Sequence, residues 1–106
     1  MSKPLSERRQ EFDAILRSID SNVHVYFQPP PSIKMEYPAI VYSRDDLYNS
    51  FANDKVYRQD DRYFVTVVDT DPDSIIADKV SKLDRCTFNR QYSSDNLNHI
   101  SFKIYY

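Results

Sequence analysis

The sequence of 106 residues contains no glycine, whereas average usage of about 7% would give about seven. Glycine allows the backbone to approach a phosphate closely, or to adopt a positive φ, without steric cost. Its absence excludes a P-loop, a dinucleotide-binding turn and a glycine-rich lid. Tight turns must instead use Asn, Asp, Ser and Pro, and such residues gather at 20–22, 29–32, 70–72 and 93–96.

Cysteine is also scarce, and basic residues do not outnumber acidic ones. The single cysteine, Cys86, cannot form an internal disulfide, and such usage is typical of a reducing compartment. The net charge is −2, so no basic excess indicates binding to nucleic acid or to an anionic membrane. No apolar run approaches membrane-spanning length, and residues 1–12 lack the apolar core of a signal peptide. We expect one soluble domain, made inside the cell and not bound to membrane.

Aromatic residues, in contrast, are plentiful: nine Tyr and six Phe. This composition favours a sheet-rich body. Apolar periodicity predicts helices at 4–20 and 72–84, and strands near 23–28, 38–44, 57–69, 86–92 and 99–106. The order αβββαββ with short connections predicts an α+β fold, a mostly antiparallel sheet of about five strands with both helices packed on it.

The stretch 57–69 is the strongest predicted strand. Both of its alternating faces carry apolar residues, so we expect it to be central in the sheet, with Val65 and Val67 buried. At the end of the first helix, Asn22 is the best candidate for a left-handed residue in place of glycine.

Three carboxylates, Asp69, Asp71 and Asp73, follow this strand at alternate positions. A metal-dependent phosphotransferase places its nucleophile and general acid in this way at a strand end. That chemistry also requires a parallel α/β sheet, for which the chain is too short. It further requires a phosphate-binding loop, and the chain lacks the glycine that such a loop uses. We therefore interpret Asp71 as the N-cap of the second helix, with Pro72 as its first residue.

Other residues capable of chemistry are dispersed. His24, His99 and Cys86 lie on separate predicted strands without the spacing of metal ligands, and a reactive Cys86 would need a nearby base. The Tyr- and Phe-rich strands could stack single-stranded nucleic acid, but that mode uses interleaved basic residues, and these loops are acidic. We predict no catalytic residue, no metal site and no cofactor.

The segment 45–56 has neither helical nor strand periodicity and is predicted to be an exposed loop or hairpin tip. Apolar residues on a long loop mark either a local hydrophobic plug or a contact with another chain. The candidate interface residues in this segment are Asp45, Asp46, Leu47, Tyr48 and Phe51.

Five segments together resemble a known family: VYFQPP, YPAIVYSRDD, DDRYFVTVVDTDPDS, ADKV and YSSDNLNH. They are similar, in order and spacing over residues 23–106, to short proteins of tailed bacteriophages of Gram-positive hosts, the tail terminators or tail-completion proteins. The resemblance implies a virion protein at the head–tail joint. Its subunits would form a six-membered ring that caps the tail tube and meets the head-completion (stopper) ring. DNA would pass through the ring without specific binding.

Three alternatives remain open. The chain could be the head-side stopper or adaptor of the same joint, a general protein-binding module, or a small metal-dependent hydrolase that uses Asp69 and Asp71. Metal-dependent turnover of a phosphoester separates the enzyme from the others, and the mass of the oligomer separates a ring from a module.

Overall fold

The computed structural model describes residues 3–52 and 55–106. Its elements are α1 (Leu5–Arg17), β1 (His24–Phe27), β2 (Ala39–Ala52), β3 (Lys55–Asp69), α2 (Ile75–Ser81), β4 (Cys86–Ser94) and β5 (Leu97–Tyr105). The predicted order αβββαββ and the α+β class are confirmed.

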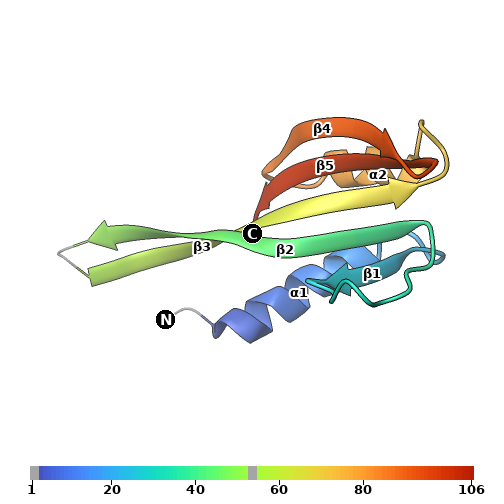
Figure 1. Ribbon diagram of the computed structural model, residues 1–106. Helices are drawn as coiled ribbons and strands as arrows, with labels where there is room; N and C mark the ends of the chain where they lie inside the picture. Colours follow the sequence, from blue (N-terminus) through green and yellow to red (C-terminus); the bar gives the residue numbers. More distant parts are fainter. Residues whose placement is uncertain (1–2, 53–54) are drawn as a thin grey trace.

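The five strands form one sheet in the order β1-β2-β3-β5-β4, so β3 is central as expected (Figure 1). All neighbouring strands are antiparallel except β1 and β2, which run parallel with His24 opposite Ala39. The segment 28–38 joins this parallel pair, and its three consecutive prolines, at 29–31, prevent it from adding a strand.

The core lies on the face of β3 that carries Tyr63, Val65 and Val67, all three fully buried. Phe12 of α1 stacks on Tyr63 at 4.4 Å between ring centroids, and Val80 of α2 joins the same cluster. Both helices therefore cover one face of the sheet. The expected burial of the two valines is confirmed, although the opposite face of β3 stays partly exposed at Phe64 and Thr66.

The helices are shorter than their apolar patterns predicted. Helix α1 ends at Arg17 rather than at residue 20, because Asp20 begins a turn in which its Oδ1 accepts from the Asn22 N–H at 2.8 Å. Asn22 does not have the positive φ expected of it. In the described residues, positive φ occurs instead at Gln28, Arg85, Asp95 and Asn96. The last two close the β4–β5 hairpin, where two consecutive positive φ values match the twist of the strands.

Of the two alternatives for 45–56, an exposed loop or a hairpin tip, the hairpin agrees with the described residues, 45–52 and 55–56. Strand β2 continues to Ala52 and β3 begins at Lys55, so the two form a long hairpin that extends past the rest of the sheet (Figure 1). The sequence shows no strand period here, and the register of the pairing shifts between Arg44 and Asp46 and again between Ser50 and Phe51. Each β-bulge inserts a residue and reverses the inside–outside alternation on which periodicity depends.

Candidate interaction surfaces

The aspartates after β3 form consecutive side-chain turns rather than a helix cap. Asp69 accepts from the Asp71 N–H at 3.1 Å, and Asp71 accepts from the Asp73 N–H at 2.9 Å. Ser74 caps α2, because its Oγ accepts from the Ala77 N–H at 3.2 Å. The interpretation of Asp71 and Pro72 as N-cap and first helical residue was wrong.

The correction has a local cause. An Asp side chain can accept a hydrogen bond from the backbone N–H two residues later, and this turn competes with the start of a helix. The turn closed by Asp69 includes Asp71. The Ser74 hydroxyl also donates to Asp69 at 2.7 Å. The carboxylates of Asp69 and Asp71 are thus both engaged in holding the β3–α2 connection. Among the described residues, no group of three or more His, Cys, Asp or Glu is placed to hold a metal ion.

The remaining residues capable of chemistry lie apart. His24 is on β1, with its Nδ1 3.6 Å from Glu36, whereas His99 is on β5 and stacks on Tyr92 at 4.8 Å between ring centroids. Cys86 begins β4 and packs against the core. Burial raises the pKa of its thiol, which reduces the reactive thiolate at neutral pH.

The most prominent surface feature is the end of the β2–β3 hairpin. We call residues 45–52 and 55–61 the hairpin arm. β1 pairs with β2 as far as Tyr42, and β5 pairs with β3 from Arg62 onward. Among the described residues, the arm strands therefore have each other as their sheet neighbours. The described molecule accordingly measures 51 × 25 × 24 Å, and the arm points away from both helices (Figure 1).

All five candidate interface residues belong to this arm. Asp45 is exposed and forms an ion pair with Arg62, with 2.7 Å between its Oδ2 and the Arg62 Nε. Leu47 is half-buried and lies opposite Asp61 in the ladder. The side chains of the other three lie outside the described part of the chain: Asp46, Tyr48 and Phe51.

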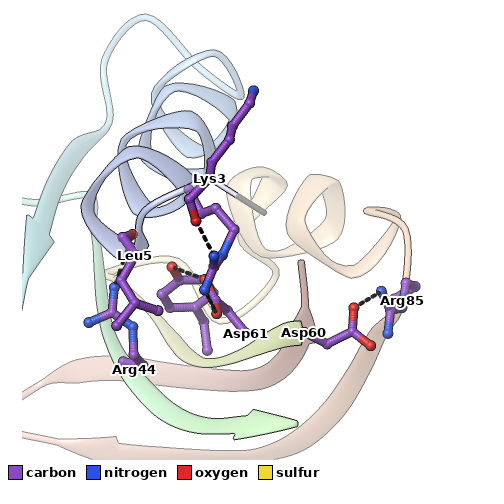
Figure 2. Close-up of polar contacts among 8 residues, drawn as sticks. Lys3, Leu5, Arg44, Asp60, Asp61 and Arg85 are labelled. Carbon is purple, nitrogen blue, oxygen red and sulfur yellow. Dashed lines mark hydrogen bonds and ion pairs between the residues drawn. The ribbon is translucent and has the colours of Figure 1, made fainter. Parts of the chain in front are cut away.

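Polar contacts hold the base of the arm to the body (Figure 2). Arg8 of α1 donates from Nε and Nη2 to the two carboxylate oxygens of fully buried Asp61, at 3.1 and 2.9 Å. The hydrogen bond to Asp61 raises the pKa of Arg8. Asp60 forms an ion pair with Arg85 at 3.3 Å, and Arg44 donates to the carbonyl of Leu5 at 3.5 Å.

Sequence reasoning missed this polar base, although one signal of it was available. Asp61 lies two, four and six positions before Tyr63, Val65 and Val67. In an uninterrupted strand, residues at these spacings share one face, so the side chain of Asp61 points toward the core. A carboxylate on a buried face needs a cationic or hydrogen-bonding partner. That partner, Arg8, lies 53 residues away in the sequence, and only the folded chain identifies it.

A second surface lies at the β4 edge of the sheet. β4 is the terminal strand in the sheet order and is exposed along almost its whole length. Between β4 and α2 runs a groove of about 500 Å³, whose floor includes Ile100 and Phe102. Its walls include Ile75 and Phe88, which are 66% and 59% exposed, more than any other large apolar residue in the described chain.

Comparison with protein-family models and with curated proteins finds no match for this sequence. Neither described helix combines the length and the apolar character needed to cross a bilayer.

Proposed function

We propose that the chain is a structural subunit of a phage head–tail joint, a tail terminator that assembles into a ring on the tail tube. The observation that carries this proposal is the hairpin arm. It projects from a small body, and in the described part of the chain its two strands pair in the sheet with each other alone.

An isolated two-stranded ribbon is at best marginally stable in water. This arm nevertheless carries Leu47, Tyr48, Phe51, Val56 and Tyr57 within a short stretch of sequence. A second protein surface that covers the ribbon would stabilise it. If the arm of each subunit binds a different surface of the next subunit, the interface is heterologous. Repetition of such an interface forms a ring when the rotation between neighbouring subunits closes.

The net charge also supports a role in which the protein encloses DNA without binding it. The chain has sixteen acidic and fourteen basic residues. Binding to duplex DNA depends on the neutralisation of phosphates by Lys and Arg, and a slightly acidic subunit offers little of this attraction. A ring of such subunits would let the genome pass without holding it. The role proposed is structural and not catalytic.

The test is the mass of the particle, measured by native mass spectrometry or analytical ultracentrifugation, alone and with purified tail-tube protein. We expect a closed ring of six copies that binds one end of the tube, visible by negative-stain electron microscopy. A ring that binds the head connector and ignores tail tubes would indicate the stopper role instead. A chain that stays monomeric at millimolar concentration, both alone and with tube protein, would contradict the proposal.

A further inference from the structure

We propose that the buried ion pair between Arg8 and Asp61 is an orientation lock: it sets the direction in which the hairpin arm leaves the body and adds little net stability. The two residues are then positioning residues for the surface that the arm meets. The direction of the arm can be measured on a single subunit, so the lock is independent of the proposed ring. Only its effect on ring closure rests on that function.

The sheet by itself leaves the direction of the arm open. Among the described residues, the pairing of β1 with β2 ends at Tyr42, and β5 pairs with β3 from Arg62 onward. At this level the register between β2 and β3 shifts, between Arg44 and Asp46. A β-bulge bends a strand and increases its local twist. The sheet neighbours therefore do not fix the angle at which the two arm strands continue.

Asp61, the last residue of the arm, is held by two other parts of the body. Its side chain is fully buried. Arg8 donates to both carboxylate oxygens, from Nε at 3.1 Å and from Nη2 at 2.9 Å. The carbonyl oxygen of Asp61 accepts from the N–H of Tyr106, just after β5, at 2.8 Å. One arm residue is thus tied to α1 through its side chain and to the end of β5 through its backbone.

Arg8 is itself held in place. It lies in the first turn of α1 and is nearly buried. Its Nη1 donates to the carbonyl of Lys3, so all three guanidinium nitrogens have acceptors (Figure 2). One turn later, Phe12 of the same helix stacks on Tyr63 in the core. A planar guanidinium that donates to two oxygens fixes the angle of its partner as well as the distance. The position of α1 therefore sets the direction of the arm.

A buried ion pair contributes geometry more than stability. Removal of two charges from water offsets most of their mutual attraction. Loss of one partner is costly, but exchange of both partners for apolar side chains is often neutral or stabilising. Apolar side chains can fill the same space, but they supply no directed hydrogen bonds. The angle imposed on the arm is therefore what distinguishes this pair from a hydrophobic contact.

The ion pair on the other side of the arm base is more exposed and offers a matched control. The Arg85 Nη1 lies 3.3 Å from the Asp60 Oδ1, and the two side chains are 43% and 17% exposed. Solvent and salt screen such a pair, and it contributes little to stability. Its removal should leave the direction of the arm unchanged.

In the proposed ring, the direction of the arm would set the angle between neighbouring subunits. A heterologous interface closes into a ring only when the rotation from one subunit to the next closes, and otherwise it gives open assemblies. A subunit whose arm has lost the lock should fold and associate, but it should give open or mixed oligomers in place of closed rings.

The first test replaces both partners, as Arg8→Met with Asp61→Leu. Spin labels at Ser50→Cys on the arm and Ser81→Cys on α2, in a Cys86→Ser background, report the distance between arm and body by double electron–electron resonance. Labelled protein is diluted into unlabelled protein, so that distances within one subunit dominate. We expect one narrow distribution without the double replacement. With it, the distribution should broaden or shift by more than its original width, whereas the urea midpoint should not fall.

Two further variants separate charge from geometry. Arg8→Lys keeps the positive charge but loses the planar fork, so the protein should fold and the distance distribution should broaden. Asp60→Asn with Arg85→Gln removes the exposed pair and should leave the distribution unchanged. Molar salt should also leave it unchanged, because a buried pair is screened far less than an exposed one.

Several outcomes would overturn the lock. These are an unchanged distribution in the double replacement, an unchanged distribution in Arg8→Lys, or equal broadening in the control that lacks the exposed pair. A double replacement that unfolds would overturn the claim that the pair adds little net stability, and Arg8→Lys would still decide whether the pair sets direction.

Native mass spectrometry of the same variants, with and without tail-tube protein, tests the effect on the ring. Closed rings from a double replacement with a displaced arm would overturn the effect on closure alone. Wild-type protein that forms no ring under either condition would overturn the proposed function, and the distances within one subunit would still decide the lock.

Discussion

Arg8 and Asp61 form a bidentate ion pair that joins the first turn of α1 to the point where β3 leaves the body. The Arg8 Nε and Nη2 lie 3.1 and 2.9 Å from the two carboxylate oxygens. The Tyr63 hydroxyl lies 3.3 Å from Asp61, and the carbonyl of Asp61 accepts from the Tyr106 N–H at 2.8 Å. These contacts place the arm at a defined direction relative to the helix.

Removal of one partner of this pair should be strongly destabilising. Asp61→Asn keeps the shape of the side chain but leaves the Arg8 guanidinium without its counter-charge at a buried site. We expect a loss of about 3 kcal/mol in the free energy of unfolding, measured by urea denaturation. Lys82→Gln removes an exposed ion pair with Asp78 and is the control, with an expected loss of at most about 0.5 kcal/mol. Equal effects of the two changes would contradict the structural role of Asp61.

The α2 cap should depend on Ser74 rather than on Asp71. Ser74→Ala removes the acceptor for the Ala77 N–H and should lower the free energy of unfolding by about 1 kcal/mol. Asp71→Ala removes only an exposed turn hydrogen bond to the Asp73 N–H and should cost less. Thermal denaturation of the two variants side by side gives the order, and the reverse order would restore Asp71 as the cap.

The two faces of β3 should respond differently to charge. Val67→Asp places an unpaired carboxylate in the fully buried core and should abolish soluble expression. Thr66→Asp, one residue earlier on the partly exposed face, should yield folded protein. The soluble fraction after expression and the far-ultraviolet circular dichroism of each variant provide the comparison. Folded Val67→Asp protein would mean that this part of the strand is not in the core.

Buried tyrosines predict a loss of stability at alkaline pH. Burial, aided by Asp13 and Asp61 respectively, raises the pKa of Tyr42 and Tyr63 above the ordinary value of 10. The folded state then holds these protons more tightly than the unfolded state. The free energy of unfolding should therefore keep its full tyrosine contribution below pH 10 and fall as the pH rises above 10.

Urea denaturation at a series of pH values measures this fall, and phenolate absorbance reports the titration directly. Tyr42→Phe removes one of the two groups, so the decline above pH 10 should be shallower in this variant. A decline of the same slope in the variant would contradict the assignment to Tyr42.

The arm should be needed for assembly but not for folding of the body. In the double variant Tyr48→Ser and Phe51→Ser, circular dichroism and melting of the monomer should stay close to the wild type, because the arm lies beyond the core cluster. Joining of filled heads to tails should fail, since large aromatic residues central to an interface contribute about 2 kcal/mol or more each. Normal infectious particles would contradict this, and so would a monomer that unfolds.

Much of the fold could be predicted because its patterns are local. Two apolar faces can be recognised from residue spacing alone: the strand face of Tyr63, Val65 and Val67, and the helix face of Phe12 and Leu16. Each face must be buried. The class, the order of elements and the central position of β3 follow from these faces and from short connections.

Tertiary structure decided the features that depend on partners distant in sequence. Two β-bulges broke the period of 45–56, so the pairing of β2 with β3 became visible only when both strands were placed together. The parallel alignment of β1 with β2 depends on the path of residues 28–38, which has no period. Ser74 rather than Asp71 caps the helix, because the Asp69 and Asp71 side chains accept from backbone N–H groups in the turns before it. The buried charge of Asp61 is balanced by Arg8, because the fold brings an α1 side chain to the base of the arm. A local sequence pattern carries no information about a contact between residues 53 positions apart.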